Sequence, residues 1–383
     1  MQRSRLLIGL YLTAVFLYWV AQYLYMPTLP LYVALHTDNL AMVGVVLSMY
    51  GLWQAIIRIP LGIFADWLGW RKPLIIIGTT LAGLGAWVMG TADGVPQLLI
   101  GRTLTGLAAG TWVLFVVAFS SLFPPQETIR VTALITLISS VGRMLATAST
   151  GFLNACGGYA LAFFAATSAA FLSGLMMLPI SEQRRQSKQP SFQGLFTILL
   201  HHRVLLPSLL SMIMQYGVWS SAYGFLPILA RALGASDVVQ SLFISLNTAL
   251  AVAGNMITAA LVKRIGKYRL LYLSFILMAC GIGIAAIASH LFMIFLALCA
   301  LGLASGIGYP LLMGMSIEQV HDSERATAMG IHQAIYALGM FGGPWISGML
   351  ADVIGIQATL GVNAFLCLFL GVFGTYKFLI ISN

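Results

Sequence analysis

Long apolar runs separated by short polar or charged breaks dominate the pattern of this chain. A helix needs roughly 20 mainly apolar residues to cross the hydrocarbon core of a bilayer. Twelve stretches meet this requirement, and we expect each to form one membrane-spanning helix. Their approximate spans are 6–26, 42–65, 73–91, 96–120, 128–152, 158–179, 205–231, 237–262, 270–288, 291–315, 326–352 and 357–379. The pattern therefore predicts an all-α integral membrane protein.

One long polar interval divides these stretches into two sets of six. It contains a charged, Gln-rich segment over residues 182–190, which is typical of a flexible or amphipathic linker. We predict a six-helix bundle over residues 1–180, a cytoplasmic linker over residues 181–204 and a second six-helix bundle over residues 205–383.

Composition and charge agree with a membrane location. Of the 383 residues, 60% are apolar and only 8% are charged, so the chain lacks the polar surface that a water-soluble protein needs. The net charge of +9 comes from short basic clusters between the apolar runs, which argues against a nucleic-acid partner. Nearly all of these clusters lie on the side of the N-terminus. Because Lys and Arg accumulate on the cytoplasmic side, we predict a multi-pass protein of the plasma (inner) membrane with both termini cytoplasmic.

The two halves repeat each other. A constant shift places Leu29-Pro30 on Leu226-Pro227, Gly69 on Gly266 and Gly151 on Gly348. Such a register across several helices indicates an internal duplication. Paired bundles around a midplane site are typical of secondary transporters, in which one half rocks against the other.

Two segments carry a family resemblance. Residues 62–72 read Gly-Ile-Phe-Ala-Asp-Trp-Leu-Gly-Trp-Arg-Lys, and residues 101–106 read Gly-Arg-Thr-Leu-Thr-Gly. They resemble the G-x-x-x-D-R-x-G-R-R loop and the R-x-x-x-G segment of the fourth helix in the major facilitator superfamily. A weaker form of the loop stands at residues 263–269. The resemblance covers essentially the whole chain and implies a bacterial-type transporter with 12 helices that works by alternating access.

The first of these segments implies a conformational latch for the outward-facing state. Its members would be Gly62, Asp66, Gly69, Arg71 and Lys72. The aspartate can accept hydrogen bonds from backbone N–H groups at a neighbouring helix start or pair with a nearby arginine, while the two basic residues meet anionic headgroups. The alternative is a charged turn that only fixes the topology.

Three arginines fall well inside the predicted spans, away from their ends, where an ionisable residue is a functional candidate by default. Arg143 lies about 22 Å along its span from Thr128, too deep to reach the inner surface easily. We expect it to contact an anionic or carbonyl-rich group of the substrate; the alternative is a bond to backbone carbonyls. Arg102 matches the family arginine and is a candidate for substrate contact or proton coupling. Arg58 is a candidate for coupling or for bonding carbonyls that Pro60 frees.

The carboxylates show the opposite distribution, because every Asp and Glu falls near the end of a span or in a loop. A site for an organic cation would require a buried acid or an aromatic cage. The absence of a central acid favours anionic, zwitterionic or neutral polar substrates.

Polar and aromatic side chains gather in the first helix of each half and add further candidates for substrate binding. Alternative roles are interfacial aromatics and interhelical hydrogen bonds. The candidates are Trp19, Gln22, Tyr23, Gln215, Tyr216, Trp219, Asn247 and Gln333. His332 is a candidate for proton coupling, although a lone histidine is more often structural.

We therefore expect a secondary active or facilitative transporter with a bias to anionic or polar solutes. The alternative is a proton-coupled multidrug exporter of the same fold. No catalytic signature such as HExxH or GxSxG occurs, and the four cysteines are scattered, so we expect neither an enzyme nor a metal site. The expected partners are a small-molecule substrate, membrane lipids and, in the coupled case, protons. We expect no cofactor and a monomeric protein.

Overall fold

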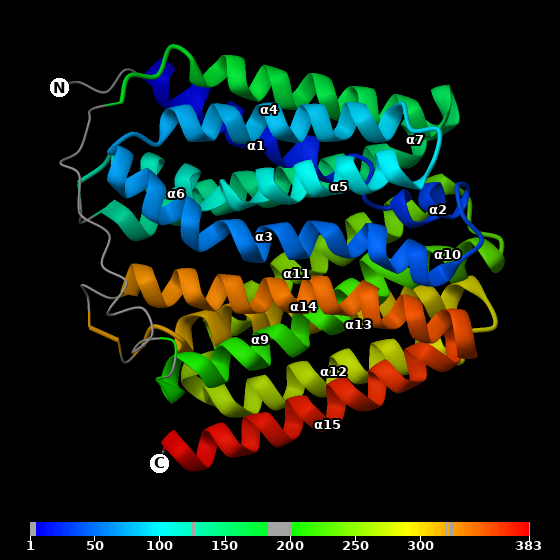
Figure 1. Cartoon of the computed structure of the whole chain (residues 1–383). Coiled ribbons are helices and arrows are strands. Elements are labelled where there is room, and N and C mark those ends of the chain that lie inside the picture. The colour runs from blue at the N-terminus through cyan, green and yellow to red at the C-terminus, as the bar shows by residue number, and fades with distance from the viewer. Residues whose placement is uncertain are drawn as a thin grey trace.

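The computed structural model describes residues 5–124, 127–182, 199, 201–318, 320–321 and 325–382. These residues form helices and short connections, and no strand occurs among them. Within this part of the chain, ten helices are long and apolar enough to cross a membrane. Figure 1 shows that the long helices run roughly side by side and that the N- and C-termini lie at the same end. Most of the predicted linker, residues 183–198 and 200, lies outside the described residues.

The described residues of the first half form seven α-helical segments. They are α1 (Arg5–Tyr23), α2 (Leu29–Ala34), α3 (Leu40–Leu68), α4 (Lys72–Gly90), α5 (Val95–Gly110), α6 (Trp112–Ser120) and α7 (Thr128–Met177). The predicted span 96–120 is divided at Thr111 into α5 and α6. The predicted spans 128–152 and 158–179 both fall in α7, whose backbone leaves helical geometry at Gly157 and Gly158.

The second half contains a π-helical segment among its α-helices. The elements are α9 (His202–Ser220), η2 (Ser221–Phe225), α10 (Leu226–Ala232), α11 (Asp237–Ile265), α12 (Lys267–Ala286), α13 (Leu291–Met315), α14 (Arg325–Ile354) and α15 (Ile356–Ser382). The predicted span 205–231 corresponds to α9, η2 and α10 together. The other predicted spans in this half each match one helix within a few residues.

Local sequence signals explain how the second long helix of each half begins and ends. Asn39 accepts a hydrogen bond from the Met42 N–H at 2.8 Å and so caps α3, and Ser236 caps α11 in the same way. Both helices stop at a glycine with positive φ, Gly69 at 70° and Gly266 at 89°. Only glycine adopts such values without strain. The repeat thus preserves both the start and the stop of this helix.

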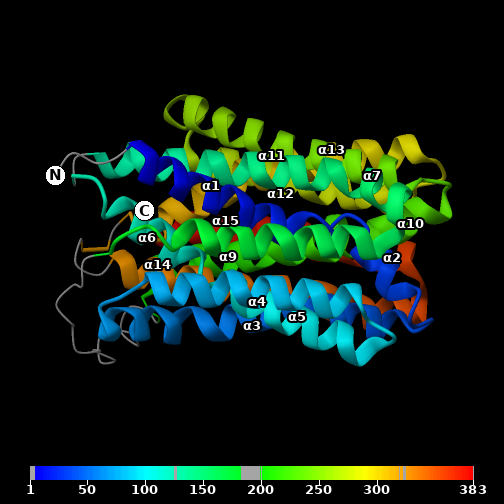
Figure 2. The same ribbon diagram turned by 90° about the horizontal axis from the view of Figure 1, so that it is seen from above.

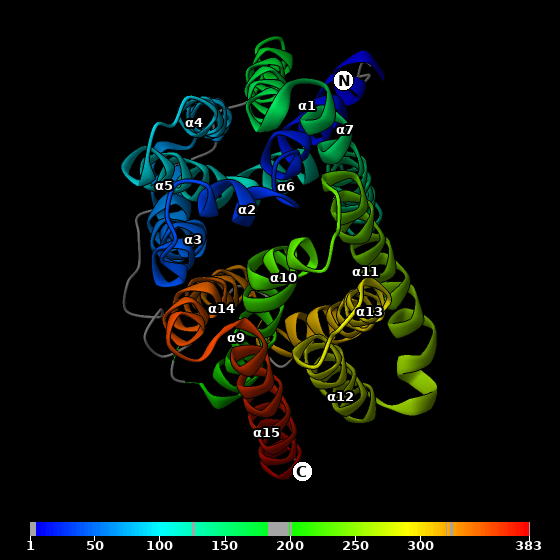
Figure 3. The same ribbon diagram turned by 90° about the vertical axis from the view of Figure 1, so that its right-hand side faces the viewer.

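Figures 2 and 3 show how the two halves meet. In the end-on view of Figure 3, α1 to α7 lie on one side and α9 to α15 on the other. The contact between the halves runs mainly along α3 with α14 and along α7 with α11. We call the end that carries α2 and α10 the distal end, and the end that carries both termini the terminal end.

At the distal end the halves approach each other through two glycines that the repeat relates, Gly151 in α7 and Gly348 in α14. A Cβ atom placed on Gly151 would lie 2.4 Å from the Asp237 carbonyl oxygen, and one on Gly348 would lie 2.8 Å from the Leu40 carbonyl oxygen. Leu40 and Asp237 are themselves related by the same shift. We call these two helix crossings the distal seal.

Hydrogen bonds reinforce the distal seal. Asn154 Nδ2 donates to Asp237 Oδ2 at 2.9 Å, and the Leu40 N–H donates to Asp352 Oδ1 at 3.1 Å. Nearer the middle, Ser245 Oγ donates to the Met144 carbonyl at 3.0 Å. Each bond joins the first half to the second, so the two halves are closed against each other at this end.

Candidate functional site

Arg143 lies on α7 with its guanidinium against two aromatic side chains of α1. Its Cζ is 4.8 Å from the ring centroid of Trp19 and 5.7 Å from that of Tyr23. Its Nη2 donates to Ser140 Oγ at 3.2 Å, and its Nε lies 3.4 Å from the Ser139 carbonyl oxygen. The side chain is only partly buried. The cation is thus held by cation–π contact and weak local bonds, with donor capacity left over.

The rings beneath Arg143 belong to a chain of aromatic side chains that crosses from one half to the other. Tyr23 of α1 contacts Tyr223 of η2, with ring centroids 6.2 Å apart, and Trp219 of α9 stacks on Tyr50 of α3 at 5.2 Å. Trp219 and Tyr223 are 5.2 Å apart. On the opposite side, Trp19 contacts Trp112 of α6 at 5.1 Å. We call Trp112, Trp19, Tyr23, Tyr223, Trp219 and Tyr50 the aromatic chain.

Arg102 of α5 lies at the Tyr50 end of the aromatic chain and has no exposed surface. Its Cζ is 4.6 Å from the Tyr50 centroid, and its Nη2 lies 3.5 Å from the Leu47 carbonyl oxygen. Its Nε has no hydrogen-bond partner. In this conformation Arg102 is therefore enclosed in the first half, and its role in binding or coupling stays a prediction.

Arg58 links the halves nearer the terminal end. Its Nη1 donates to the Gln333 carbonyl on α14 at 3.0 Å, and its Cζ is 4.8 Å from the centroid of Tyr336. This carbonyl belongs to the other half and is not one that Pro60 frees, so the contact differs from the predicted one, and a coupling role for Arg58 stays a prediction. Arg58 lies 8% exposed in this arrangement.

None of the ion pairs found in the described part of the chain involves these three arginines. Among the described residues, the ion pairs are Arg71 with Asp66, Arg231 with Asp237 and Lys267 with Glu318. All three pairs lie at helix ends. The central arginines are held instead by ring faces and neutral oxygens, so an incoming anion would meet uncompensated positive charge.

The remaining predicted binding residues divide into two groups. Gln22 donates through Nε2 to the Thr105 carbonyl at 3.3 Å, and its Oε1 is buried without a partner, as is Nε1 of Trp19. Asn247 donates to the Leu298 carbonyl at 2.7 Å, and Tyr216 donates to Asn363 Oδ1 at 2.7 Å. These last two bonds join helices within the second half. The structure therefore brings Trp19 and Tyr23 against Arg143, places Trp219 further along the aromatic chain, and draws Gln22, Asn247 and Tyr216 into helix packing.

The other two amides are less fully engaged. Gln215 is partly exposed on α9, next to Tyr216. Gln333 contributes its backbone carbonyl to Arg58, while its side-chain Oε1 is buried without a partner.

His332 is fully buried on α14 between two serines of α9. Ser208 Oγ lies 3.1 Å from Nδ1 and also donates to the Val204 carbonyl at 2.6 Å, while Ser211 Oγ lies 3.3 Å from Nε2. Because the Ser208 hydroxyl hydrogen is committed to Val204, Nδ1 must be the donor to Ser208, and Nε2 can accept from Ser211. The site thus suits a neutral imidazole. Its role in proton coupling stays a prediction.

The predicted latch loop connects α3 to α4. Arg71 Nη2 donates to Asp66 Oδ1 at 3.0 Å, which is one of the two pairings expected for this aspartate. The other partner, the N-terminus of α4, is taken by Glu182, which accepts from the Arg71 and Lys72 N–H groups at 2.9 and 2.7 Å. The Asp66 side chain remains 59% exposed, and no residue in the described part of the second half forms a hydrogen bond or ion pair with it. Gly62 has open space around its Cα, and Gly69 forms the turn.

A model of the family described as the Major Facilitator Superfamily matches residues 11–218 and 208–381, which is nearly the whole chain. The chain belongs to the major facilitator superfamily. This member is accordingly a multi-pass membrane protein that transports small-molecule substrates, as its family and its apolar helices show together.

Similar proteins place this superfamily member among transporters of varied substrates. It is 25% identical over 84% of its length, and 84% of the other chain, to the class C tetracycline resistance protein of Escherichia coli. It is 33% identical to the inner membrane transport protein YajR of Escherichia coli (strain K12) over 91 residues, which span 24% of this chain and 20% of YajR.

Solved structures confirm the fold. The nucleoside transporter NupG matches with a TM-score of 0.78 and 15% identity, covering 97% of this chain and 99% of the other. A bacterial homolog of the human lysosomal transporter Spinster, in an inward-facing and unoccupied conformation, matches with a TM-score of 0.79 and 14% identity, covering 98% and 97%. At these identities the likeness concerns the fold alone.

Sequence reasoning missed several residues of the superfamily member's centre. Tyr50, Trp112 and Tyr336 supply ring faces to the arginines or to Trp19 but were not singled out. Glu182 was assigned to the linker, yet it caps α4. For the three aromatic residues, the only signal in the sequence was an aromatic side chain in an apolar span. Such side chains are too common in membrane helices to identify a site.

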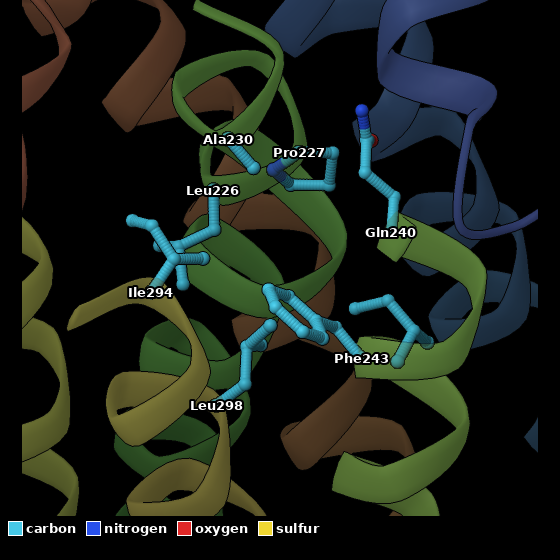
Figure 4. A pocket seen from close by; sticks show the side chains of 8 residues that line it. Leu226, Pro227, Ala230, Gln240, Phe243, Ile294 and Leu298 are labelled. Carbon is cyan, nitrogen blue, oxygen red and sulfur yellow. The ribbon is translucent and has the colours of Figure 1, made fainter. Parts of the chain in front are cut away.

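A separate small pocket lies between α10, α11 and α13 near the distal end (Figure 4). Its walls are apolar apart from Gln240, whose side chain points past Pro227 toward the edge of the pocket. It contains none of the residues around Arg143 and adds no charge with which to bind a solute.

Proposed function

We propose that this superfamily member moves a small organic anion or polar solute by alternating access, with Arg143 as its principal binding residue. The observation that carries the proposal is the guanidinium of Arg143, which is partly exposed and lacks an acidic partner among the described residues. Arg102 and Arg58 add positive charge on the same half of the protein.

The chemistry of the surrounding side chains supports this choice. A guanidinium binds carboxylate or phosphate through two parallel hydrogen bonds, and both bonds gain strength away from water. Trp19 offers a second donor, because its buried Nε1 has no partner. The aromatic chain provides ring faces on which a planar part of the solute can stack.

We further propose twelve spans in two six-helix bundles, over residues 1–180 and 205–383. This count takes α7 as two spans divided at Gly157 and Gly158, and takes α9, η2 and α10 as one. The described members of the basic clusters stand where α3 meets α4 and α11 meets α12 at the terminal end, which supports placing that end in the cytoplasm of a bacterial inner membrane. The distal seal would then close the outer side, and the exposed Asp66 carboxylate would belong to a disengaged latch.

A thermal-shift screen of the purified protein tests the binding proposal. Matched anionic, zwitterionic, neutral and cationic solutes are compared on the wild type, on Arg143→Gln and on Arg130→Gln. Arg130 is exposed on the same helix and so controls for the loss of one charge. A ligand at 100 times its Kd stabilises a protein by about 2.7 kcal/mol.

We expect anions to stabilise the wild type and the Arg130→Gln variant. The Arg143→Gln variant should bind them about 10- to 150-fold more weakly, because a hydrogen bond to a charged group contributes about 1.5–3 kcal/mol. Equal anion shifts in a folded Arg143→Gln variant would overturn the assignment of Arg143.

The second candidate is a proton-coupled multidrug exporter of the same fold. It is favoured by the aromatic chain, which suits apolar planar ligands, and by the similarity to a tetracycline resistance protein. In this case Arg102, Arg58 or His332 would take part in coupling. Stabilisation of all three proteins by lipophilic cations, together with solute-driven proton movement in proteoliposomes, would establish this candidate over the first.

A further inference from the structure

The second half contains a cavity of about 470 Å³ at the terminal end, and neither Arg143 nor any residue of the aromatic chain lines it. It lies between the ends of α11 and α13 and the starts of α12 and α14. A volume of this size falls in the range of small-molecule sites. Its lining residues are Val262, Lys267, Pro310, Leu311, Gly314, Met315, Ile317, Glu318 and Arg325.

The lining is divided by chemistry. The residues from α11 and α13 give an apolar wall, formed chiefly by Val262, Leu311 and Met315. The charged side chains come from the helix ends, Lys267 at the start of α12 and Arg325 at the start of α14, with Glu318 after α13. Lys267 Nζ donates to Glu318 Oε2 at 2.5 Å. The cavity is therefore amphipathic, with an apolar interior and a charged rim.

The rim carries net positive charge. Among the described lining residues, Lys267 and Arg325 outnumber Glu318, and two further basic residues, Lys263 and Arg264, are exposed at the end of α11. Basic pockets between membrane helices at the bilayer surface attract anionic headgroups, and each Lys or Arg near the surface contributes about 1 kcal/mol. A free inorganic anion would use the rim alone and leave the apolar wall without a partner.

We propose that this cavity binds an anionic phospholipid, with its phosphate at the rim beside Lys267 and Arg325 and its upper acyl chain against the apolar wall. The site is distinct from the transport site and does not depend on which solute is carried. Because α14 packs along α3 of the other half, a lipid held at the start of α14 would act on the contact between the halves.

Gly314 provides a variant that fills the cavity without disturbing the helix packing. A Cβ atom on this residue would meet nothing within 4 Å, so Gly314→Leu places its side chain in open space. Lys267→Gln removes one rim charge and leaves the wall intact. Arg269→Gln is the matched control, because Arg269 is exposed two residues away and does not line the cavity.

The test measures retained lipid by native mass spectrometry and thermal stability in nanodiscs of phosphatidylcholine with and without phosphatidylglycerol. We expect phosphatidylglycerol to bind and stabilise the wild type and the Arg269→Gln variant. Affinity should fall about 5-fold in Lys267→Gln, which is the loss of about 1 kcal/mol. It should fall at least as far in Gly314→Leu, which keeps every charge.

Two results would overturn the proposal. Unchanged phosphatidylglycerol binding in both Gly314→Leu and Lys267→Gln would show that the lipid binds elsewhere. Equal stabilisation by inorganic phosphate, with no sensitivity to Gly314→Leu, would assign the rim to a free anion and exclude the acyl chain.

Discussion

Replacing Gly151 by alanine should open the distal seal. The added methyl group would lie 2.4 Å from the Asp237 carbonyl oxygen and 2.4 Å from the Val238 Cα, both of them backbone atoms that cannot rotate away. Ordinary contacts of a Cβ begin at 3.4 Å, so α7 and α11 would have to separate by about 1 Å at this crossing. In a conformation with the distal end open, the helices are apart and the methyl group meets no obstacle.

The size of the effect follows from this difference between the two conformations. Overpacking of a tight contact costs about 1–3 kcal/mol, and here the cost falls on the closed state alone. The ratio of open to closed molecules should therefore rise about 5- to 150-fold. Alanine also has a higher helix propensity than glycine, by roughly 1 kcal/mol. This gain is the same in both conformations and therefore does not change their ratio.

The assay is a distance measurement between spin labels across the distal end. Labels on cysteines at positions 38 and 353, before α3 and near the end of α14, report the separation of the halves in a variant whose four native cysteines are replaced. Gly348→Ala, with its contact at 2.8 Å, should produce a smaller change than Gly151→Ala. Gly283→Ala is the control, because nothing lies within 4 Å of a Cβ there.

We expect Gly151→Ala to show the largest population at longer distance and Gly348→Ala a smaller one. The Gly283→Ala control should show no such population. A Gly151→Ala distribution that matches the control, in a protein that still folds, would refute the reasoning that these glycines hold the closed state together.

Further predictions concern contacts within each half. Asn363→Ala breaks the bonds to Tyr216 and Ser347 and should cost about 1–3 kcal/mol of stability in thermal unfolding, whereas the exposed Asn255→Ala should have little effect. Glu182→Gln weakens the cap on α4 by about 0.5–2 kcal/mol, and hydrogen exchange should quicken in the first turn of that helix and nowhere else. Trp19→Phe keeps a ring under Arg143 but removes the indole N–H. The affinity for anions should therefore fall, while the melting temperature of the unliganded protein should change little. Equal anion affinities in the variant and the wild type would show that Trp19 Nε1 does not belong to the site.

The long helices were predictable because each is an apolar run of membrane length that ends at a polar, glycine or proline signal. Gly69 and Gly266 stop their helices as the repeat implies. The π-segment η2 was not predicted, whereas the irregular backbone at Gly157 and Gly158 falls at the predicted break between the spans 128–152 and 158–179. Such local departures are stabilised by contacts with other helices, and a single run of sequence does not contain them.

The side chains around Arg143 were likewise only partly predictable from the sequence. The sequence named Arg143, Trp19 and Tyr23 separately as candidates for substrate binding, and the structure brings the three side chains together. Tyr216 and Trp219 lie one turn apart in sequence, yet Tyr216 bonds to α15 while Trp219 stacks on Tyr50 of the other half. In an apolar helix most faces are equally hydrophobic, so the direction of each polar side chain depends on neighbours that the sequence pattern leaves open.

The unpaired arginines also have an electrical consequence. Arg58, Arg102 and Arg143 all belong to the first half, and no described carboxylate neutralises them. A charge that crosses the full membrane field exchanges about 2.3 kcal/mol with each 100 mV of potential. Any rocking that carries the first half along the field therefore performs electrical work, and a bound anion reduces that work by cancelling part of the charge. The membrane potential thus acts differently on the loaded and the empty transporter.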